Sequence, residues 1–278
     1  MSPSLSVYAL PTQVAPEELA GATAVVMDVL RASTTIITAL EAGAREVIPC
    51  LEIEEAQAAA AEFLPGEVLL GGERHGRRIE GFDLGNSPAG YTPDVVAGKT
   101  LIFTTTNGTR ALGRCRLAQR VLVGAFVNAT AVVDELLGVD RIFLMCAGTE
   151  GQLSRDDFLM AGFLVDRLER QGGATYELNV QAADARKEWL SAFPSPTARG
   201  LSQFGRGLSQ FLWSKNGTVP FESEPLARQL TDSLGGENLV KIGMEDDILA
   251  AAQVDRFAHV PELTPDHRCV RLNLGGRR

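Results

Sequence analysis

The chain has 278 residues, of which 45% are hydrophobic and 22% are charged, a composition typical of a globular enzyme. Its 26 basic and 35 acidic residues give a formal net charge of −9. Because a field of that sign repels DNA, RNA and anionic lipid, the charge argues against a protein that binds nucleic acid or a membrane surface. If the substrate is an anion, local positive groups must bind it against this field.

The N-terminal sequence and the hydropathy argue against export and membrane insertion. Residues 1–12 have neither the basic region nor the apolar core of a signal peptide. No apolar stretch reaches the roughly 20 residues that a membrane helix needs. Cys50 and Cys146 lie in apolar runs and are expected to be buried thiols in a reducing compartment. We therefore expect a cytoplasmic protein with no membrane partner.

Six short apolar runs, most of them rich in β-branched residues, predict strands that are covered on both faces. They span residues 24–29, 46–51, 68–70, 100–105, 120–123 and 141–146. Helix-like segments follow most of these runs, at residues 33–42, 53–63, 109–115, 129–137 and 155–171. Strands that alternate with helices indicate a doubly wound, three-layer α/β domain with a largely parallel sheet.

This alternation breaks down in two regions. A glycine-rich loop over residues 71–98 replaces the helix after the third run, and long loops in compact domains are usually functional. After residue 175, prolines and glycines interrupt the pattern. Short helices are expected over 201–213, 224–233 and 243–254, and edge strands over 259–263 and 270–274. We expect an α/β core over residues 1–180 and a C-terminal extension over 181–278 that packs on it.

Ligands of open α/β sheets bind beyond the carboxyl ends of the strands, and polar residues follow the first predicted strand. Asp28 ends the apolar run, Arg31 comes three residues later, and Ser33 and Thr34 open the next helix. A carboxylate can bind Mg²⁺, an arginine can bind phosphate through two hydrogen bonds, and a helix N-terminus offers free N–H groups to an anion. The alternative is an ordinary helix cap with a surface arginine.

Further candidates follow the third and fourth strands. Glu73 and Asp83 are candidate metal ligands, and Arg74 is a candidate anion ligand. After the fourth strand, hydroxyl groups and an Asn-Gly turn precede a helix, in the manner of an anion-binding turn. The candidates there are Thr105, Thr106, Asn107, Gly108 and Thr109. A flexible surface loop and a simple capped turn are the alternatives for these two segments.

The sixth strand is followed by Glu150, which could orient a water or bind a metal. Asp156 and Asp157 are more typical of side chains that complement the helix dipole. Strand ends that together present Asp, Glu, Arg and Thr indicate a site for magnesium and phosphate. Residues 74–76 read Arg-His-Gly, a signature of histidine phosphatases, but they follow the third strand instead of the first and so do not favour that chemistry.

Taken in order, five segments resemble the motifs of a known family. They are residues 26–35, residues 71–74 with 81–88, residues 104–112, residues 146–151, and residues 243–248 with 260–261. The family is 2-phosphosulfolactate phosphatase, an enzyme of coenzyme M biosynthesis. The resemblance implies a magnesium-dependent hydrolase that converts 2-phosphosulfolactate, or a closely related phosphorylated hydroxy acid, to sulfolactate and phosphate. It also implies a three-layer α/β/α fold with a mostly parallel, mixed sheet, and it leaves residues 186–230 unmatched.

The residue types lead to a mechanistic hypothesis. Asp28 with Glu73 or Asp83 holds Mg²⁺, while the metal and Arg31 neutralise the phosphoryl oxygens in a loose transition state. A water that the metal activates or that Glu150 orients attacks the phosphorus. The alternative is that Asp28 itself attacks as a covalent nucleophile.

The sequence also bears on whether the protein is an enzyme or a binding protein, and on its oligomeric state. A binding protein for a small phosphorylated acid, without catalytic activity, is the alternative from a different class. Carboxylates at three strand ends argue against it, because a pure anion binder gains nothing from them. A homodimer is expected, since parallel sheets often leave an edge on which a second copy can pair.

Overall fold

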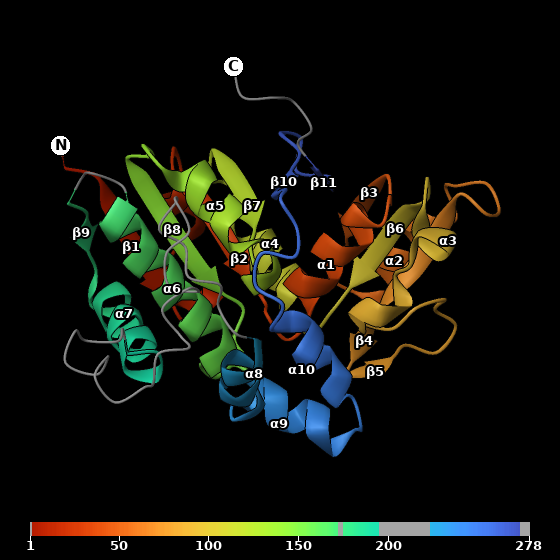
Figure 1. The fold of residues 1–278 in the computed structure, drawn as a ribbon. Coiled ribbons are helices and arrows are strands. Elements are labelled where there is room, and N and C mark those ends of the chain that lie inside the picture. Colours follow the sequence, from red (N-terminus) through yellow and green to blue (C-terminus); the bar gives the residue numbers. More distant parts are fainter. Residues whose placement is uncertain (1, 172–174, 195–222, 273–278) are drawn as a thin grey trace.

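The structure is a computed structural model, and it describes residues 2–171, 175–194 and 223–272 (Figure 1). The strands are β1 Ser4–Tyr8, β2 Thr23–Met27, β3 Glu46–Pro49, β4 Val68–Arg74, β5 Arg77–Arg78, β6 Thr100–Thr104, β7 Arg120–Val123, β8 Arg141–Cys146, β9 Glu177–Leu178, β10 Pro261–Leu263 and β11 Val270–Leu272. The α-helices are α1 Ala32–Glu41, α2 Ile53–Ala60, α3 Pro93–Val96, α4 Gly108–Arg114, α5 Ala129–Leu136, α6 Arg155–Gln171, α7 Val180–Ala192, α8 Ser223–Thr231, α9 Leu234–Lys241 and α10 Glu245–Ala251.

The strands form one mixed sheet in the order β5-β4-β6-β3-β11-β10-β7-β2-β8-β1-β9. Two groups of parallel strands, β4-β6-β3 and β7-β2-β8-β1-β9, lie on either side of the antiparallel hairpin β10–β11. Within the larger group, β2 is central, and Val25 lies opposite both Leu122 and Leu144. The six predicted strands are all present, and the prediction of a three-layer α/β/α fold with a mostly parallel, mixed sheet is confirmed.

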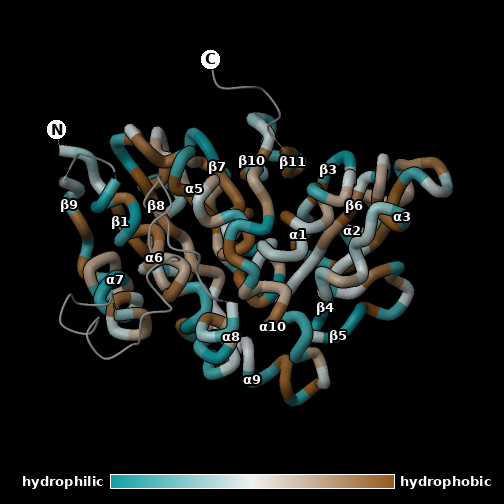
Figure 2. Tube along the Cα trace, in the orientation of Figure 1, coloured by the Kyte–Doolittle hydropathy of each residue, from teal (hydrophilic) through white to brown (hydrophobic). Residues whose placement is uncertain are grey.

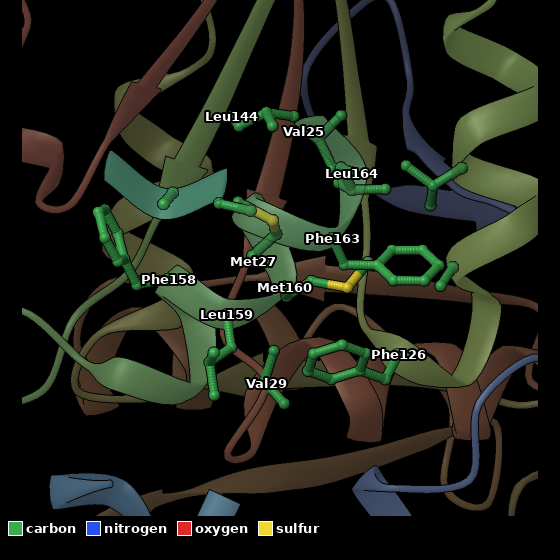
Figure 3. Close-up of a cluster of buried hydrophobic side chains, with 14 of the residues drawn as sticks. Val25, Met27, Val29, Phe126, Leu144, Phe158, Leu159, Met160, Phe163 and Leu164 are labelled. Carbon is green, nitrogen blue, oxygen red and sulfur yellow. The ribbon is translucent and has the colours of Figure 1, made fainter. Parts of the chain in front are cut away.

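The side chains of β2 point alternately to the two faces of the sheet, and on each face they join a buried hydrophobic cluster. Successive side chains of a strand point to opposite faces, so Val25 and Met27 join one buried cluster while Ala24 and Val26 join the other. In Figure 3, Val25 lies near Leu164 and Met27 lies near Met160, two side chains of α6 in the same buried cluster. All five residues of β2 are buried, which explains why its sequence is apolar throughout.

The covering helices are amphipathic, and Figure 2 shows hydrophobic and hydrophilic stretches interleaved along them. α6 and α7 pack closely on the face that carries Val25 and Met27, where Trp189 of α7 stacks on Phe126 and meets Phe163 edge to face. α1 and α4 cover the other face. Among the described residues, no helix combines the length and the apolar character that crossing a bilayer requires. Cys50 and Cys146 are buried free thiols, as predicted.

The C-terminal strands do not lie where the sequence predicts. They were expected at the edge of the sheet, but β10 pairs with β7 and β11 pairs with β3, so the hairpin occupies the middle. Arg120 of β7 binds the carboxylate of Glu262 in β10 at 2.9 Å, and Val270 of β11 is fully buried opposite Val47. The hairpin therefore links the two parallel groups, and the division of the chain at residue 180 stays a prediction.

The loop expected over residues 71–98 contains more regular structure than predicted. β4 continues to Arg74 and turns back through β5, and the short helix α3 follows at Pro93–Val96. Sequence patterns also missed the outer strands β1 and β9 and the helices α7 and α9. The helix expected over residues 201–213 lies outside the described residues.

Helices α8, α9 and α10 pack on one another and lie together at the carboxyl end of β2 in Figure 1. Ser233 caps α9 by accepting a hydrogen bond from the Gly236 N–H at 3.0 Å. Ile248 and Ala251 of α10 are buried in the same cluster as α6. This packing places the C-terminal helices beside the loops that leave the strands.

Candidate active site

A pocket of about 260 Å³ lies where the carboxyl ends of β2, β4, β6 and β8 meet helix α9. Six of the residues predicted from the sequence line it: Asp28, Arg31, Glu73, Thr106, Asn107 and Glu150. Further polar residues that were not among the predicted site residues also line it: His75, Asn86, Thr149, Asn238 and Lys241. The strand-end rule therefore locates the site, and four different strands contribute to it.

Asp28 is buried directly after β2, with 8% of its surface exposed. Its Oδ1 accepts a hydrogen bond from the Ala32 N–H at 3.1 Å, and its backbone N–H donates to the Ser33 hydroxyl at 2.9 Å. Burial raises the pKa of Asp28 to about 7, and repulsion from Asp156 and Glu73 adds to the rise. A carboxyl group in this setting gains by binding a cation.

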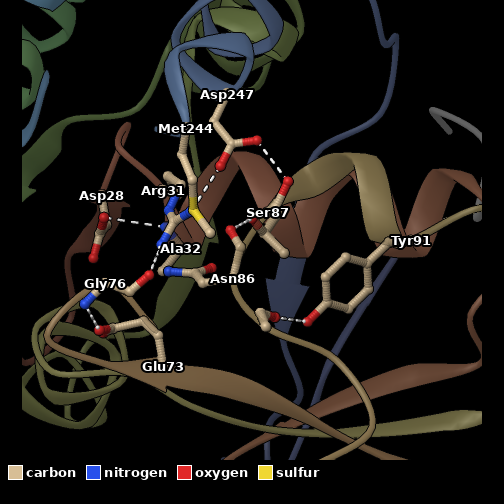
Figure 4. Close-up of polar contacts among 12 residues, drawn as sticks. Asp28, Arg31, Ala32, Glu73, Gly76, Asn86, Ser87, Tyr91, Met244 and Asp247 are labelled. Atoms are coloured by element: carbon tan, nitrogen blue, oxygen red, sulfur yellow. Dashed lines mark hydrogen bonds and ion pairs between the residues drawn. The ribbon is translucent and has the colours of Figure 1, made fainter. Parts of the chain in front are cut away.

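Glu73 faces Asp28 from β4 and is equally buried, at 7% exposure (Figure 4). Its Oε2 accepts from the Gly76 N–H at 2.7 Å, and its Oε1 accepts from the Thr106 N–H at 2.8 Å. These bonds tie the turn after β4 to the turn after β6. Glu73 therefore has a fixed orientation on the wall of the pocket.

Two oxygen atoms beside these carboxylates are buried and have no hydrogen-bond partner among the described residues: Asn86 Oδ1 and Thr106 Oγ1. Both residues line the pocket. Buried polar atoms in native structures nearly always have a partner, so two orphans at one pocket point to a missing ligand or ion. Two carboxylates, an amide oxygen and a hydroxyl form an all-oxygen donor set, which suits Mg²⁺.

The structure does not bring the third expected metal ligand, Asp83, to this pocket. Its Oδ2 accepts from the Leu70 N–H at 2.8 Å in an exposed part of the loop. No cluster of three or more His, Cys, Asp or Glu with metal-binding geometry occurs among the described residues. Asp28 and Glu73 remain the two buried carboxylates that line the pocket, a number that fits Mg²⁺, which usually keeps several waters.

Arg31 is buried at 4% exposure and reaches the pocket from the loop before α1. Its Nη2 donates to the Gly76 carbonyl at 2.8 Å, and its Nη1 donates to the Asp247 carboxylate at 2.7 Å (Figure 4). Asp247 belongs to α10 and lies 216 residues further along the chain. Asp247 lies in the motif at residues 243–248, but no sequence pattern predicts that it pairs with Arg31.

Several other predicted ligands act within the protein instead of facing the pocket. The Arg74 guanidinium donates to the carbonyls of Glu73 and Leu51 and to the Thr104 hydroxyl. The hydroxyls of Ser33 and Thr34 bond to backbone atoms around Asp28, and those of Thr105 and Thr109 bond within their own turn. These side chains shape the loops, and the structure does not place them at the lining of the pocket.

Gly108 explains how closely α4 approaches the site. A Cβ atom at this position would lie 2.6 Å from the Ala32 Cβ and 2.7 Å from Asp28 Oδ2. Real Cβ atoms do not approach other atoms so closely, so only glycine allows the start of α4 to lie against Asp28. The predicted role of Gly108 as a ligand stays a prediction, whereas its packing role follows from the geometry.

Asp156 and Asp157 at the start of α6 do more than complement the helix dipole. Asp157 accepts from the Val29 N–H at 2.8 Å and from the Gly148 N–H at 3.0 Å. Asp156 accepts from the Leu30 N–H at 3.2 Å. The two carboxylates hold the loop after β2 against the loop after β8, and burial raises the pKa of each.

Glu150 and His75 line the pocket with unusual backbone conformations. Their φ angles are 54° and 53°, in the left-handed region that non-glycine residues seldom adopt. Both side chains are exposed, one in the turn after β8 and the other in the turn between β4 and β5. Such conformations gather at functional sites because the surrounding structure enforces them.

Comparisons with known proteins agree with this geometry. A family model described as 2-phosphosulpholactate phosphatase matches residues 8–203. A protein of Thermotoga maritima, named as a probable 2-phosphosulfolactate phosphatase, is 47% identical over 184 residues, which are 65% of this chain and 79% of that protein. The chain belongs to the 2-phosphosulfolactate phosphatase family. The resemblance seen in the sequence is thereby confirmed.

Other members of the 2-phosphosulfolactate phosphatase family are similar over a comparable region. The probable 2-phosphosulfolactate phosphatase of Thermotoga petrophila is 42% identical over 184 residues, covering 65% of this chain and 79% of that protein. That of Clostridium novyi is 45% identical over 151 residues, covering 54% of this chain and 64% of that protein. The match to the latter thus spans slightly less than two thirds of its length.

The region matched by the 2-phosphosulfolactate phosphatase family model ends before the C-terminal helices. Asn238 and Lys241 of α9 line the pocket, and Asp247 of α10 binds Arg31, although all three lie beyond residue 203. One wall of the site is therefore built by a part of the chain that the family model does not cover.

Proposed function

We propose that this member of the family is a magnesium-dependent phosphatase that hydrolyses 2-phosphosulfolactate, or a closely related phosphorylated hydroxy acid, to sulfolactate and phosphate. The observation that carries the proposal is the convergence of buried Asp28 and Glu73, two unpaired oxygen atoms and buried Arg31 at one pocket. The family match and the names of the relatives support a phosphatase. The resemblance of the sequence motifs is our ground for a role in coenzyme M biosynthesis, and the buried free thiols are our ground for a cytoplasmic location.

The oxygen atoms of Asp28, Glu73, Asn86 and Thr106 would hold Mg²⁺. When bound, the ion supplies positive charge that neutralises the phosphoryl oxygens as the ester bond breaks. Asp28 Oδ2 and the orphaned Asn86 Oδ1 and Thr106 Oγ1 make no hydrogen bond within the described residues, which leaves them available for this role. The bonds that Glu73 accepts from two backbone N–H groups fix its carboxylate in advance.

Cationic side chains suit the acid groups of the substrate. 2-Phosphosulfolactate carries a phosphate, a sulfonate and a carboxylate, and the pocket offers Arg31 from one wall and Lys241 from another. Lys241 lies 3.7 Å from Glu237 in an exposed pair, and such pairs contribute little stability. Lys241 can therefore turn to a ligand at little cost, while Asn238 adds an amide donor on the same helix.

Glu150 supplies an exposed carboxylate on the wall of the pocket that the turn after β8 forms. We propose that Glu150 orients the attacking water, because its carboxylate can accept a hydrogen bond from that water and hold it in line with the ester bond. Its position in the turn after β8, next to the loop that Asp157 fixes, keeps it at the mouth of the pocket.

Phosphate release from a panel of small phosphorylated acids tests the proposal. The panel includes 2-phosphosulfolactate and 2-phospholactate, each assayed with Mg²⁺ and with a chelator. We expect release that requires Mg²⁺ and prefers the sulfonate substrate, and a loss of at least 100-fold in kcat/KM in Glu73→Gln. Tight binding of the same acids without phosphate release would instead indicate a binding protein.

A further inference from the structure

The C-terminal helix α10 places a carboxylate next to the arginine of the pocket. Asp247 lies 2.7 Å from Arg31 Nη1, and both side chains are almost completely buried, at 5% and 3% exposure. A buried ion pair costs much desolvation energy and seldom stabilises a fold more than apolar residues would. The pair therefore calls for an explanation other than stability.

Other atoms complete the environment of this ion pair (Figure 4). The Ser87 hydroxyl donates to Asp247 Oδ1 at 2.6 Å, so one oxygen of Asp247 binds Ser87 while the other binds Arg31. On the arginine, Nη2 donates to the Gly76 carbonyl at 2.8 Å and Nη1 also contacts the Met244 sulfur. The guanidinium is thus held by Asp247 and Met244, which do not line the pocket, and by the backbone carbonyl of Gly76, which does.

The remaining edge of the guanidinium is available to a ligand. Arg31 lines the pocket, and its Nε–H has no hydrogen-bond acceptor in the described part of the chain. A guanidinium binds phosphate best when its planar group is fixed in advance. Asp247 supplies this restraint, because it holds Nη1 on the side away from the ligand.

Helix α10 does not need Asp247 in order to pack. Its apolar residues Ile248 and Ala251 are buried at 2% and 0% exposure. The next acid on the helix, Asp246, is exposed and has no partner among the described residues. The contrast between two neighbouring acids, one exposed and one buried on Arg31, indicates that position 247 serves the site.

We propose that Asp247 is a positioning residue that orients Arg31 for binding the phosphoryl group, so that α10 forms part of the active site. The effect of Asp247 on turnover rests on the proposed function. Its effect on the binding of phosphate does not. It also assigns a task to a segment beyond the region that the family model matches.

Calorimetric binding of inorganic phosphate, with Mg²⁺ present, tests the proposal in the full-length chain. We expect Asp247→Asn to weaken phosphate binding on the order of 10- to 100-fold, the range seen when the hydrogen-bonding partner of a metal ligand is removed. Asp246→Asn is the matched control and keeps the affinity of the wild type. If Asp247 only screened the charge of Arg31, its removal would tighten phosphate binding, and equal or tighter binding overturns the proposal.

A double-mutant cycle separates positioning from general structural damage. In an Arg31→Ala background, Asp247→Asn should change phosphate affinity by less than about twofold, because the residue acts through Arg31. A further large loss in that background overturns the proposal. Ser87→Ala provides a milder variant in case Asp247→Asn unfolds, and we expect it to weaken phosphate binding in the same direction, whereas unchanged affinity contradicts the role.

Turnover of 2-phosphosulfolactate by the same variants keeps the two hypotheses apart. If the wild type binds phosphate but releases none from the ester, the proposed function fails while the positioning role is still decided by binding. If the wild type is active, Asp247→Asn should lower kcat more than it raises KM, since the oriented guanidinium acts on the charge of the transition state. An effect on Tm alone, with binding and kcat unchanged, contradicts the proposal.

Discussion

Among the residues of the site, Asp28 gives the clearest expectation for how stability depends on pH. Its pKa rises from 3.8 to about 7, first because burial disfavours the charged form and then because Asp156 and Glu73 repel it. Between pH 4 and pH 7 the folded protein therefore holds a proton that the unfolded chain has released. The free energy of unfolding should then fall as the pH rises through this window, by about 1 kcal/mol per pH unit.

Asp28→Asn tests this consequence without an activity assay. The amide keeps an oxygen for the Ala32 N–H but removes the charge, so we expect Tm at pH 8 to exceed that of the wild type, with little difference at pH 4. Mg²⁺ should raise the Tm of the wild type at pH 8 and leave Asp28→Asn unchanged. Asp94→Asn, at an exposed position on α3, is the control. An equal response of both proteins to Mg²⁺ would remove Asp28 from the metal site.

The sequence correctly predicts pocket residues that follow the end of a strand. It is wrong where two adjacent candidates point to opposite faces of the strand. Glu73 and Arg74 are both predicted ligands, but consecutive residues of β4 point to opposite sides. Glu73 therefore faces Asp28, and Arg74 turns to the Thr104 hydroxyl. Asn86 and Asp247 lie in the motifs at residues 81–88 and 243–248, but no local pattern shows that these segments and Lys241 come together with the strand ends.

At the scale of elements, the N-terminus of α4 sets how closely the turn after β6 approaches the loop after β2. Gly108→Ala should displace the start of α4 from Ala32 and Asp28, because the added methyl would lie within 2.7 Å of both. We expect a loss of about 1–3 kcal/mol in stability and a lower rate of phosphate release. Urea denaturation and the phosphate assay measure the two effects.

Gly113→Ala, on the same helix, provides the control for this prediction. A Cβ atom there would lie 3.6 Å from the Leu51 side chain, an ordinary contact. Because alanine favours a helix over glycine, stability should be unchanged or rise by about 0.5–1 kcal/mol. If both variants behave alike, the close approach of α4 to Asp28 has no role in the site.

The elements themselves differ in how well their sequences predict them. The six predicted strands are apolar over several residues, and the helix over residues 155–171 shows a clear period, so local patterns suffice. β10 and β11 have only three residues each and make a single bridge to β7 and to β3. Their place in the middle of the sheet depends on contacts between distant parts of the chain, and such contacts leave no periodic signal.

At the scale of the whole molecule, the site lies where the two parallel groups of strands and the C-terminal helices meet. The carboxyl ends of strands from both parallel groups reach one pocket, and helices α8–α10 pack beside it (Figure 1). The hairpin β10–β11 joins the two groups, so the last part of the chain both completes the sheet and, through Asp247, contacts the arginine of the site. The arrangement explains why residues far apart in sequence serve one chemistry.

The central claim is that this pocket binds a divalent cation together with phosphate. Diffraction from crystals that contain Mn²⁺ in place of Mg²⁺, together with inorganic phosphate, tests it most directly. We predict an anomalous peak in contact with Asp28 and Glu73, with phosphate between the ion and Arg31. An ion bound at another place, for instance at Asp83, or phosphate bound away from Arg31 while the pocket remains accessible, would contradict the account.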